Sequence, residues 1–337
     1  MERMTKFGED QLGKGIVIGK DTPNFVGNRI GCYSMSLTMN EMLNANLTPE
    51  DVDAITGPPM GHPKSASFRT ADMVGLDTFK HVSDNCYEAL VDDPERDVFK
   101  PPAFMVAMVE QKILGNKTRG GFYKKTKEGI QTFDPVKLEY RAKAGDAEIK
   151  KFCKGLKGSP ADRVKALVEN DGPAGQFAWN ILSRTLAYSA AKIPEITDRV
   201  EDVDNGMKWG YNWDLGPFET WDAIGFKAAY DRMKADGIEL PASIDKMAES
   251  GAESFYTDDG RVYDLVNGGY VARDIDPRNA SLTILSKGDA PAYEHRGTQA
   301  WDLGDGILGL SFTTKANSID DTVVGGITPS VDLAERV

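Results

Sequence analysis

Apolar residues recur at helical spacing over most of the chain, and two long stretches carry the strongest pattern. Residues 25–45 and 175–192 are predicted to form long helices, and small residues among the apolar ones of the first stretch indicate that another helix packs closely on it. Thr48 followed by Pro49 predicts the start of a short helix, since a hydroxyl caps the first turn and proline is tolerated there. The glycines and prolines of residues 57–61 end that helix. The pattern therefore predicts a mainly α fold.

The same skeleton occurs twice. Residues 25–75 correspond to residues 177–225 with a change of register of only two positions. The equivalent pairs are Phe25 and Phe177, Asn28 and Asn180, Asp51 and Asp202, Phe68 and Phe218, Asp72 and Asp222, and Gly75 and Gly225. We therefore predict two repeated helical-bundle domains, at 21–142 and 161–275, with a linker at 143–160.

Two smaller elements are predicted at the end of the first bundle. Pro101 and Pro102 are expected to open a helix that continues to Leu114, and a hairpin is expected around residues 127–129. Asp72 and its repeat partner are expected to cap a helix or accept buried hydrogen bonds, because use in both copies suggests architecture.

The two ends of the chain follow other patterns. Residues 2–13 are predicted to be helical and 16–18 to be a β-strand, so residues 1–20 are interpreted as the remnant of a removed α-β sheet domain, or else as an edge hairpin or frayed terminus. Apolar residues alternate at 308–312, which predicts a strand followed by a helix. Residues 296–337 are interpreted as the truncated β/α start of another domain.

Composition excludes several classes of partner. The chain has 52 acidic and 40 basic side chains, and its net charge of −12 repels nucleic acid and anionic membrane surfaces. No segment of the sequence is long and apolar enough to span a membrane. Cys32, Cys86 and Cys153 are odd in number and widely spaced, which favours buried thiols in a reducing, cytoplasmic environment.

Three motifs resemble the 3-hydroxyacyl-CoA dehydrogenases. Residues 20–29 (KDTPNFVGNR) resemble the passage from the dinucleotide-binding domain into the helical domain of that family. Residues 60–77 and 117–123 (KTRGGFY) resemble two later family segments, in the family's order. Residues 301–319 look like the opening of an enoyl-CoA hydratase domain of the crotonase family. The resemblance implies a bifunctional enzyme of fatty-acid β-oxidation, with helical bundles like the C-terminal domains of 6-phosphogluconate dehydrogenases.

The resemblance implies that NAD is the cofactor and that the intact enzyme oxidises 3-hydroxyacyl-CoA to 3-oxoacyl-CoA. No strand is followed by a G-x-G-x-x-G helix start, and the family's catalytic histidine and glutamate would lie upstream of the first motif. We therefore expect this chain to be inactive without an N-terminal dinucleotide-binding domain. His62, His81 and His295 are interpreted as structural or solvated side chains.

Two residues inherit a role from the resemblance. Asn28 matches an asparagine that contacts substrate and orients the catalytic histidine, although the residues alone would favour local hydrogen bonding at a helix start. Lys117 matches a lysine that contacts NAD, although a lysine after a helix usually complements the helix dipole. No metal site is expected. The alternative function is a non-catalytic helical module for dimerisation or docking, and a homo-oligomer is expected in either case.

Overall fold

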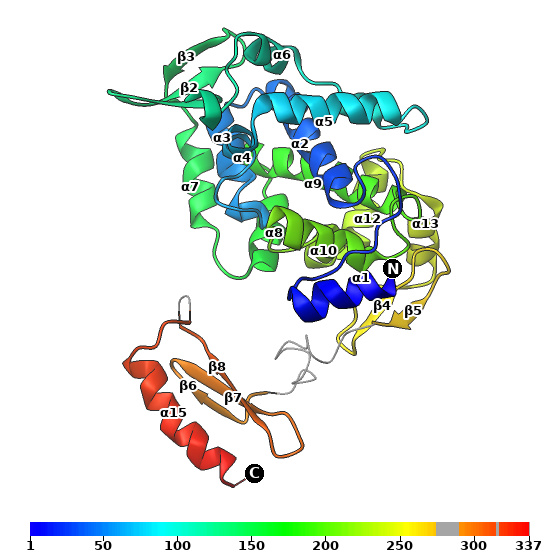
Figure 1. Ribbon diagram of the computed structural model, residues 1–337, viewed down its shortest axis with the longest axis vertical. Coiled ribbons are helices and arrows are strands. Elements are labelled where there is room, and N and C mark those ends of the chain that lie inside the picture. Colours follow the sequence, from blue (N-terminus) through cyan, green and yellow to red (C-terminus); the bar gives the residue numbers. More distant parts are fainter. Residues whose placement is uncertain (274–289, 315–316, 337) are drawn as a thin grey trace. The chain divides into compact units, whose positions relative to one another are not determined.

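The computed structural model describes residues 1–273, 290–314 and 317–336 of the 337-residue chain (Figure 1). The chain forms two compact units, one of residues 1–255 with 263–269 and one of 256–262 with 270–337. The end of the predicted second bundle, at 274–275, and residues 315–316 of the hydratase-like motif lie outside the described residues.

Two long helices form the centre of the larger unit. Helix α2 (Gly27–Asn44) and helix α9 (Pro173–Ala191) pack against each other, and most of their side chains are buried. Tyr33 of α2 and Tyr188 of α9 stack with ring centroids 3.8 Å apart and planes inclined by 3°. The prediction of two long, largely apolar helices is confirmed. The core lies along their contact.

Shorter helices surround α2. They are α3 (Pro49–Ile55), α4 (Phe68–Val74), α5 (Leu76–Ala89) and α6 (Ala103–Glu110). Three 3₁₀ turns occur among them, at Pro58–Met60, Arg96–Phe99 and Asn116–Thr118. The predicted cap of α3 is confirmed, because the Asp51 backbone N–H donates to the Thr48 hydroxyl at 3.3 Å and the Thr48 N–H donates to the Asp51 carboxylate at 3.0 Å.

The predicted extent of α6 was wrong. The helix ends at Glu110, four residues before Leu114, because Lys112 adopts a left-handed backbone conformation (φ 59°). The backbone N–H of Ile113 then turns back to the carbonyl of Met108 at 2.8 Å. A left-handed residue after the last turn is a common way for a helix to stop, and lysine carries no strong sequence signal for it.

A second set of helices lies before and after α9 in the chain. It comprises α8 (Pro160–Val168), α10 (Val200–Tyr211), α11 (Pro217–Ile224), α12 (Phe226–Ala235) and α13 (Ala242–Glu249). Helices α8 and α11 of this set pack on α9. Equivalent positions make equivalent contacts in the two sets. Asp53 accepts from the Phe68 N–H at 2.7 Å, and Asp204 accepts from the Phe218 N–H at 2.8 Å.

A second pair of equivalent aspartates, Asp72 and Asp222, also makes similar hydrogen bonds in the two sets. Asp72 accepts hydrogen bonds from the backbone N–H groups of Phe122 (2.7 Å) and Tyr123 (2.9 Å). Asp222 accepts one from the backbone N–H of Phe255 at 2.7 Å. Each aspartate therefore ties its helix to a later segment of the same set, and the predicted architectural role of Asp72 and Asp222 is confirmed.

A small antiparallel sheet follows α6. It consists of β1 (Tyr123–Thr126), β2 (Gly129–Asp134) and β3 (Glu139–Ala142) in sequence order. The predicted hairpin is confirmed as β1 and β2. The third strand was not predicted, since its four residues include only Tyr140 and Ala142 as apolar positions.

The segment at 143–160, predicted as the linker between the two bundles, contains a helix that was not predicted. Helix α7 (Ala147–Gly155) begins at Asp146, whose carboxylate accepts from the backbone N–H groups of Glu148 (2.7 Å) and Ile149 (3.2 Å). Ile149 and Cys153 are buried, and α7 packs on α3. Two apolar residues four positions apart suffice to anchor this short helix, and the surrounding lysines hide them in the sequence pattern.

The N-terminal residues form a helix but no strand. Residues Glu2–Lys6 form α1, and a π turn continues over Phe7–Gln11, so the helical prediction is confirmed. The strand predicted at 16–18 was wrong. The backbone N–H of Ile18 donates to Asp202 at 3.3 Å, and that of Lys20 donates to the Ile196 carbonyl at 2.8 Å. These backbone donors therefore find partners in the second helical set without a sheet.

The smaller unit combines short strands with one helix. Strand β5 (Tyr270–Ala272) and all but the last residue of β4 (Arg261–Tyr263) belong to this unit, and the two strands form a two-stranded sheet. Strands β6 (Tyr293–His295), β7 (Thr298–Asp302) and β8 (Leu308–Phe312) form an antiparallel sheet, on which α15 (Asp321–Ala334) packs. The strand at 308–312 and the helix after it are confirmed.

Replacing Asp72 tests whether it joins α4 to the sheet. Asp72→Ala leaves the buried N–H groups of Phe122 and Tyr123 without their acceptor, so the free energy of unfolding should fall by about 2–4 kcal/mol. Urea denaturation followed by circular dichroism measures the change. Asp84→Ala is the matched control, because Asp84 forms only a partly exposed ion pair with Lys80 and its loss should cost less than about 1 kcal/mol. Equal losses in both variants would contradict the assigned role.

Candidate functional site

The site is built on the first turn of α2. Asn24 and Phe25 both have left-handed backbones (φ 64° and 51°), which turn the chain into the helix that begins at Gly27. Successive residues of a helix point about 100° apart, so Asn28 and Arg29 face different surroundings. Arg29 is fully buried, whereas Asn28 is exposed.

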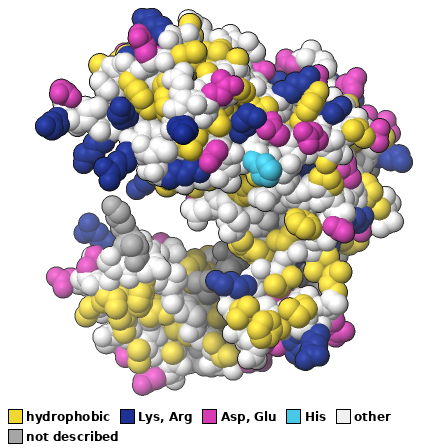
Figure 2. All heavy atoms as spheres, turned by 45° about the horizontal axis from the view of Figure 1, so that its top comes forward, with side chains coloured by type: hydrophobic (Ala, Val, Ile, Leu, Met, Phe, Trp, Pro, Cys, Tyr) yellow, Lys and Arg dark blue, Asp and Glu magenta, His cyan; other side chains and the backbone are white. Residues whose placement is uncertain are grey.

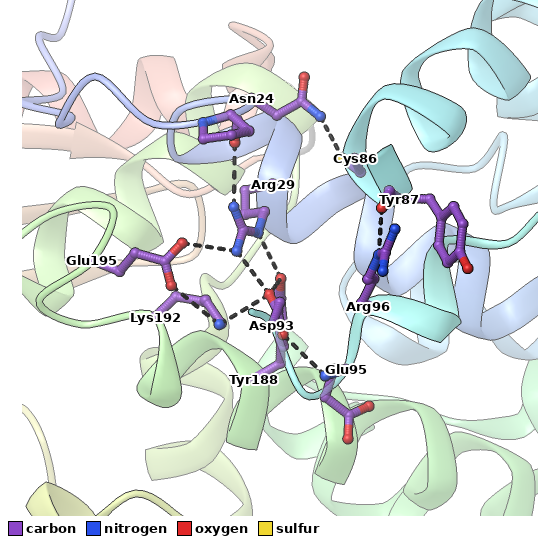
Figure 3. Close-up of polar contacts among 11 residues, drawn as sticks. Asn24, Arg29, Cys86, Tyr87, Asp93, Glu95, Arg96, Tyr188, Lys192 and Glu195 are labelled. Atoms are coloured by element: carbon purple, nitrogen blue, oxygen red, sulfur yellow. Dashed lines mark hydrogen bonds and ion pairs between the residues drawn. The ribbon is translucent and has the colours of Figure 1, made fainter. Parts of the chain in front are cut away.

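Arg29 lies in a buried network of charged and polar side chains (Figure 3). Its Nη2 contacts the carboxylates of Asp93 (2.8 Å) and Glu195 (2.9 Å), and its Nε donates to the Tyr188 hydroxyl at 2.6 Å. Lys192 contacts the same two carboxylates at 3.0 and 3.2 Å. The network joins the start of α2 to the C-terminal end of α9 and to the loop after α5.

The charges of the network balance. Two cations meet two carboxylates, and the Tyr188 hydroxyl donates to Asp93 at 2.8 Å. Burial by itself would raise the pKa of Asp93, but hydrogen bonds from Lys192 and Tyr188 hold that pKa below its ordinary value. Asp93 is therefore ionised at neutral pH, and Arg29 does not lose its proton under any ordinary condition. The network therefore stays charged, and its ion pairs persist at neutral pH.

A cavity of about 620 Å³ opens beside α2. Its lining is largely apolar and comes from α2, α4, α5, the loop after α3 and the C-terminal end of α10. The lining includes Asn28, Gly31, Met35, His62, Met73, Val74, Phe79, Val82, Tyr211 and Trp213. A concave, mainly apolar space of this size with a few polar groups is typical of a small-molecule site.

Asn28 lies in this lining and is fixed by Tyr211. The Tyr211 hydroxyl donates to the Asn28 Oδ1 at 2.9 Å. Burial raises the pKa of Tyr211 above its ordinary value, so the hydroxyl keeps its proton at neutral pH. With Oδ1 engaged in this way, the Nδ2 group of Asn28 is left to donate to a ligand in the cavity, since no other residue in the described ranges accepts from it.

A glycine lets Tyr211 come so close to α2. A Cβ atom on Gly31 would lie 2.3 Å from the Tyr211 ring, and one on Gly27 would lie 3.4 Å from the Gly206 carbonyl oxygen. The predicted close packing at the small residues of α2 is thus confirmed. Alanine at position 31 would displace the ring and with it the hydroxyl that holds Asn28.

His62 is the histidine that lines the cavity. Its ring stacks on Trp213 with centroids 4.0 Å apart, and its Nδ1 lies 3.1 Å from the Thr56 carbonyl oxygen. Burial lowers its pKa to about 4, so the imidazole is neutral at neutral pH. His81 is exposed beside Asn85, and His295 lies in the smaller unit. These positions agree with the structural interpretation of the histidines.

The three cysteines are free and buried, as predicted. Burial raises the pKa of the Cys32 thiol to about 12 and that of Cys153 to about 11, so neither is a thiolate nucleophile at neutral pH.

Within the described residues, no group of three or more histidine, cysteine, aspartate or glutamate side chains could hold a metal ion. In the same part of the chain, no helix has the length and apolar character needed to cross a membrane.

Lys117 does not line the cavity that contains Asn28. It lies in the 3₁₀ turn before β1, and its Nζ contacts the Asp77 carboxylate at the start of α5. The structure therefore does not bring the two predicted site residues into one cavity. An ion pair with Asp77 accounts for this lysine without a cofactor.

The described residues do not fit a dinucleotide. Both three-stranded sheets are antiparallel, and the spacing G-x-G-x-x-G occurs at residues 304–309, where it links strands β7 and β8. A dinucleotide cradle needs the same spacing between a strand and a helix, whose N-terminus binds the pyrophosphate. No step of hydride transfer is therefore assigned to this part of the chain.

Several residues of the site were not predicted from the sequence. Tyr211 and the partners of Arg29 lie 64 to 183 residues away along the chain, so spacing in the sequence could not reveal them. One signal was present: Arg29 is a cation among the apolar and small residues that begin α2. A charge in such a position must be paired when it is buried.

Comparison with known proteins supports the family resemblance. Residues 25–125 match the family model described as 3-hydroxyacyl-CoA dehydrogenase, C-terminal domain. The chain is 42% identical over 338 residues to a "Probable 3-hydroxyacyl-CoA dehydrogenase" of Bacillus subtilis, covering 99% of this chain and 42% of that protein. It is 30% identical over 227 residues to a "Putative fatty acid oxidation complex trifunctional enzyme" of Rickettsia felis, covering 65% of this chain and 30% of that protein.

A crystal structure of 3-hydroxybutyryl-CoA dehydrogenase from Escherichia coli is 16% identical, with a TM-score of 0.49, and the match covers 71% of this chain and 63% of that one. The chain spans less than half the length of the two curated relatives. The resemblance carried by the three sequence motifs is confirmed by the family model and the relatives' names.

Replacing Arg29 tests the buried network. Arg29→Met leaves the carboxylate of Asp93 buried with one cation fewer, and the free energy of unfolding should fall by about 3–5 kcal/mol. Guanidinium denaturation measures the loss. Lys227→Met is the control, since Lys227 pairs with Asp231 at the exposed surface of α12 and its removal should cost about 1 kcal/mol or less. A loss below about 1 kcal/mol for Arg29→Met would show that the network contributes little to stability.

Proposed function

We propose that this chain, whose residues 25–125 belong to the 3-hydroxyacyl-CoA dehydrogenase family, forms the substrate-side wall of the active-site cleft in an NAD-dependent enzyme of that family. Such an enzyme oxidises the 3-hydroxyl group of an acyl-CoA to a 3-oxo group. NAD would accept the hydride when bound to a dinucleotide-binding domain, which the described residues do not build. The chain's own task is to bind the acyl group and orient the reacting oxygen.

The observation that carries this proposal is the position of Asn28. It lies in the lining of the 620 Å³ cavity, with its carbonyl oxygen held by Tyr211. Its Nδ2 group is suited to donate a hydrogen bond to the oxygen on C3 of the substrate or to a catalytic imidazole from another domain. An amide does this without changing its charge with pH, so it holds both partners over the whole working range.

The apolar remainder of the cavity suits an acyl chain. Met35 comes from α2, Met73 from α4, and Phe79 and Val82 from α5. Methionine side chains adapt to chains of different shape, since they are unbranched and flexible. We propose that the acyl chain lies along these residues. Lys117, which matches the family's NAD-contacting lysine, would leave Asp77 to meet the cofactor in this proposal.

We also propose that the two helical sets arose by duplication of one bundle. The equivalent hydrogen bonds of Asp53 and Asp204, and those of Asp72 and Asp222, support this origin. The linker at 143–160 would then mark the junction of the copies.

For the tail we propose the start of a crotonase-like hydratase domain, without activity of its own. It is supported by the motif at 301–319 and by a relative named as a trifunctional fatty acid oxidation enzyme. That name also supports a role in fatty-acid β-oxidation.

Replacing Asn28 tests the proposed function. The chain, joined to or mixed with a dinucleotide-binding domain of the family, should form NADH from 3-hydroxybutyryl-CoA, and absorbance at 340 nm follows the reaction. Asn28→Ala should lower kcat about 10²-fold with little change in unfolding free energy, because one oriented donor is lost from the transition state.

The matched control is Asn180→Ala, in α9, which the sequence repeat pairs with Asn28. Its Nδ2 contacts Glu41 at 3.3 Å and it does not line the cavity, so its kcat should be unchanged. Normal turnover by Asn28→Ala would refute the assignment. Tight self-association in sedimentation, without acyl-CoA binding in calorimetry, would instead favour a dimerisation or docking module. A homo-oligomer that binds acyl-CoA is compatible with the proposal.

Replacing Tyr211 tests how Asn28 is oriented. Tyr211→Phe keeps the ring against Gly31 but removes the hydroxyl that donates to Asn28. In the same assay kcat should fall about 3–10-fold, as for one hydrogen bond of ordinary strength, while KM changes little. The double variant with Asn28→Ala should be no slower than Asn28→Ala alone. Additive losses would show that Tyr211 acts independently of Asn28.

A further inference from the structure

A second cavity of the larger unit concentrates positive charge. It has a volume of about 660 Å³ and lies among α3, α7 and the first strand of the β1–β3 sheet. Six cationic side chains line it: Lys64, Arg69, Lys143, Lys150, Lys154 and Arg163. The whole chain carries a net charge of −12, so this concentration runs against the overall sign. Lys and Arg side chains also gather on this side of the larger unit in the space-filling view (Figure 2).

The carboxylates of the cavity are already engaged within the fold. Glu50 forms a two-pronged ion pair with Arg141, at 2.8 and 2.9 Å. Asp51 caps α3 and accepts from the Asp146 N–H at 2.5 Å, and Asp146 caps α7. Glu50 is therefore neutralised by Arg141, while Asp51 and Asp146 are held by backbone donors and leave the six cations in excess.

The fourth carboxylate, Asp53, accepts hydrogen bonds from the Phe68 N–H and the Tyr123 hydroxyl, both at 2.7 Å. Burial raises its pKa to about 7, so much of it is uncharged near neutral pH. It therefore offsets little of the positive charge around it.

Four of the lysines have no such partners. Lys64, Lys143, Lys150 and Lys154 form no ion pair with any residue that the structure describes. Lys150 and Lys154 lie four residues apart on α7, where two like charges repel each other. Lys151, between them, contacts Glu148 instead and is not in the lining. The lining face of α7 is thus left with uncompensated charge.

The floor of the cavity is apolar and aromatic. Pro58, Pro59 and the Tyr123 ring contribute to it, and the Arg69 guanidinium lies 4.8 Å above that ring. Arg163 is held by the Pro58 carbonyl at 3.0 Å and by Asp214 at 3.2 Å. Two positioned arginines and four unpaired lysines thus surround a space of nucleotide size.

We propose that this cavity binds a small molecule that carries two or more phosphate groups. Cations distributed around one cavity match a ligand whose negative charge is itself distributed over several groups, and each lysine can donate to a phosphate oxygen. A single small anion would meet only part of the set. The site is separate from the cavity of Asn28 and does not depend on the proposed dehydrogenase function.

Calorimetry with defined phosphate probes tests the site. Pyrophosphate and ADP should bind the chain with a Kd below about 1 mM, and both affinities should weaken with added NaCl because the contacts are ionic. Lys150→Gln combined with Lys154→Gln should weaken binding about tenfold or more, since charge-assisted hydrogen bonds are lost. Tighter binding of ADP would identify a nucleotide as the source of the phosphates, and tighter binding of pyrophosphate would identify a free diphosphate.

Lys151→Gln is the matched control, because it removes the same charge from the same helix outside the cavity. It should leave both affinities unchanged, and circular dichroism should show that all variants fold alike. Equal weakening by Lys151→Gln would overturn the proposal in favour of a general charge effect. Sulfate binding as tightly as pyrophosphate, or polyglutamate binding where pyrophosphate does not, would also overturn it.

Discussion

The buried guanidinium of Arg29 is the constraint on which the arrangement of the helices depends. Its charge cannot be removed by deprotonation, so the fold must supply carboxylates where α2 meets α9. Asp93 comes from the loop after α5 and Glu195 from the chain just past α9, and Lys192 restores neutrality. A buried network adds less to stability than its contacts suggest, because desolvation opposes them. We infer that its main effect is to permit only one register between the two helices.

That register determines the site. With Arg29 fixed on one side of α2, Asn28 must face the other, where the end of α10 brings Tyr211 against Gly31. The hydroxyl of Tyr211 then donates to the amide oxygen of Asn28, and this hydrogen bond fixes the orientation of the amide. The cavity wall is thus assembled from both helical sets, with Asn28 from the first and Tyr211 from the second. A substitution that disturbs the contact between α2 and α9 would therefore also displace the residues that line the cavity.

The sequence predicted the elements that depend on neighbouring residues, and it missed those that depend on contacts with distant residues. The long helices, the Thr48 cap and the β1–β2 hairpin follow from periodicity and turn residues within a few positions of each other. Helix α7 was missed because only Ile149 and Cys153 mark its buried side, and the strand expected at 16–18 was wrong because Asp202, far along the chain, satisfies its backbone. Asn28 was selected through the family motif, whereas its orientation by Tyr211 required tertiary contacts.

Asn28 and Asn180, which the sequence repeat pairs, make different contacts in the structure. Asn28 lies in the first turn of α2, whereas Asn180 lies in the third turn of α9, and its amide donates to Glu41 of α2, which also pairs with Arg184 at 3.0 Å. Asn180 is therefore half-buried at the contact between the long helices, while Asn28 is exposed in the lining of a cavity. The difference follows from where each helix begins, because α9 starts seven residues before Asn180 and α2 starts one residue before Asn28. The same residue type is therefore part of the cavity wall in the first helical set and part of the contact between the long helices in the second.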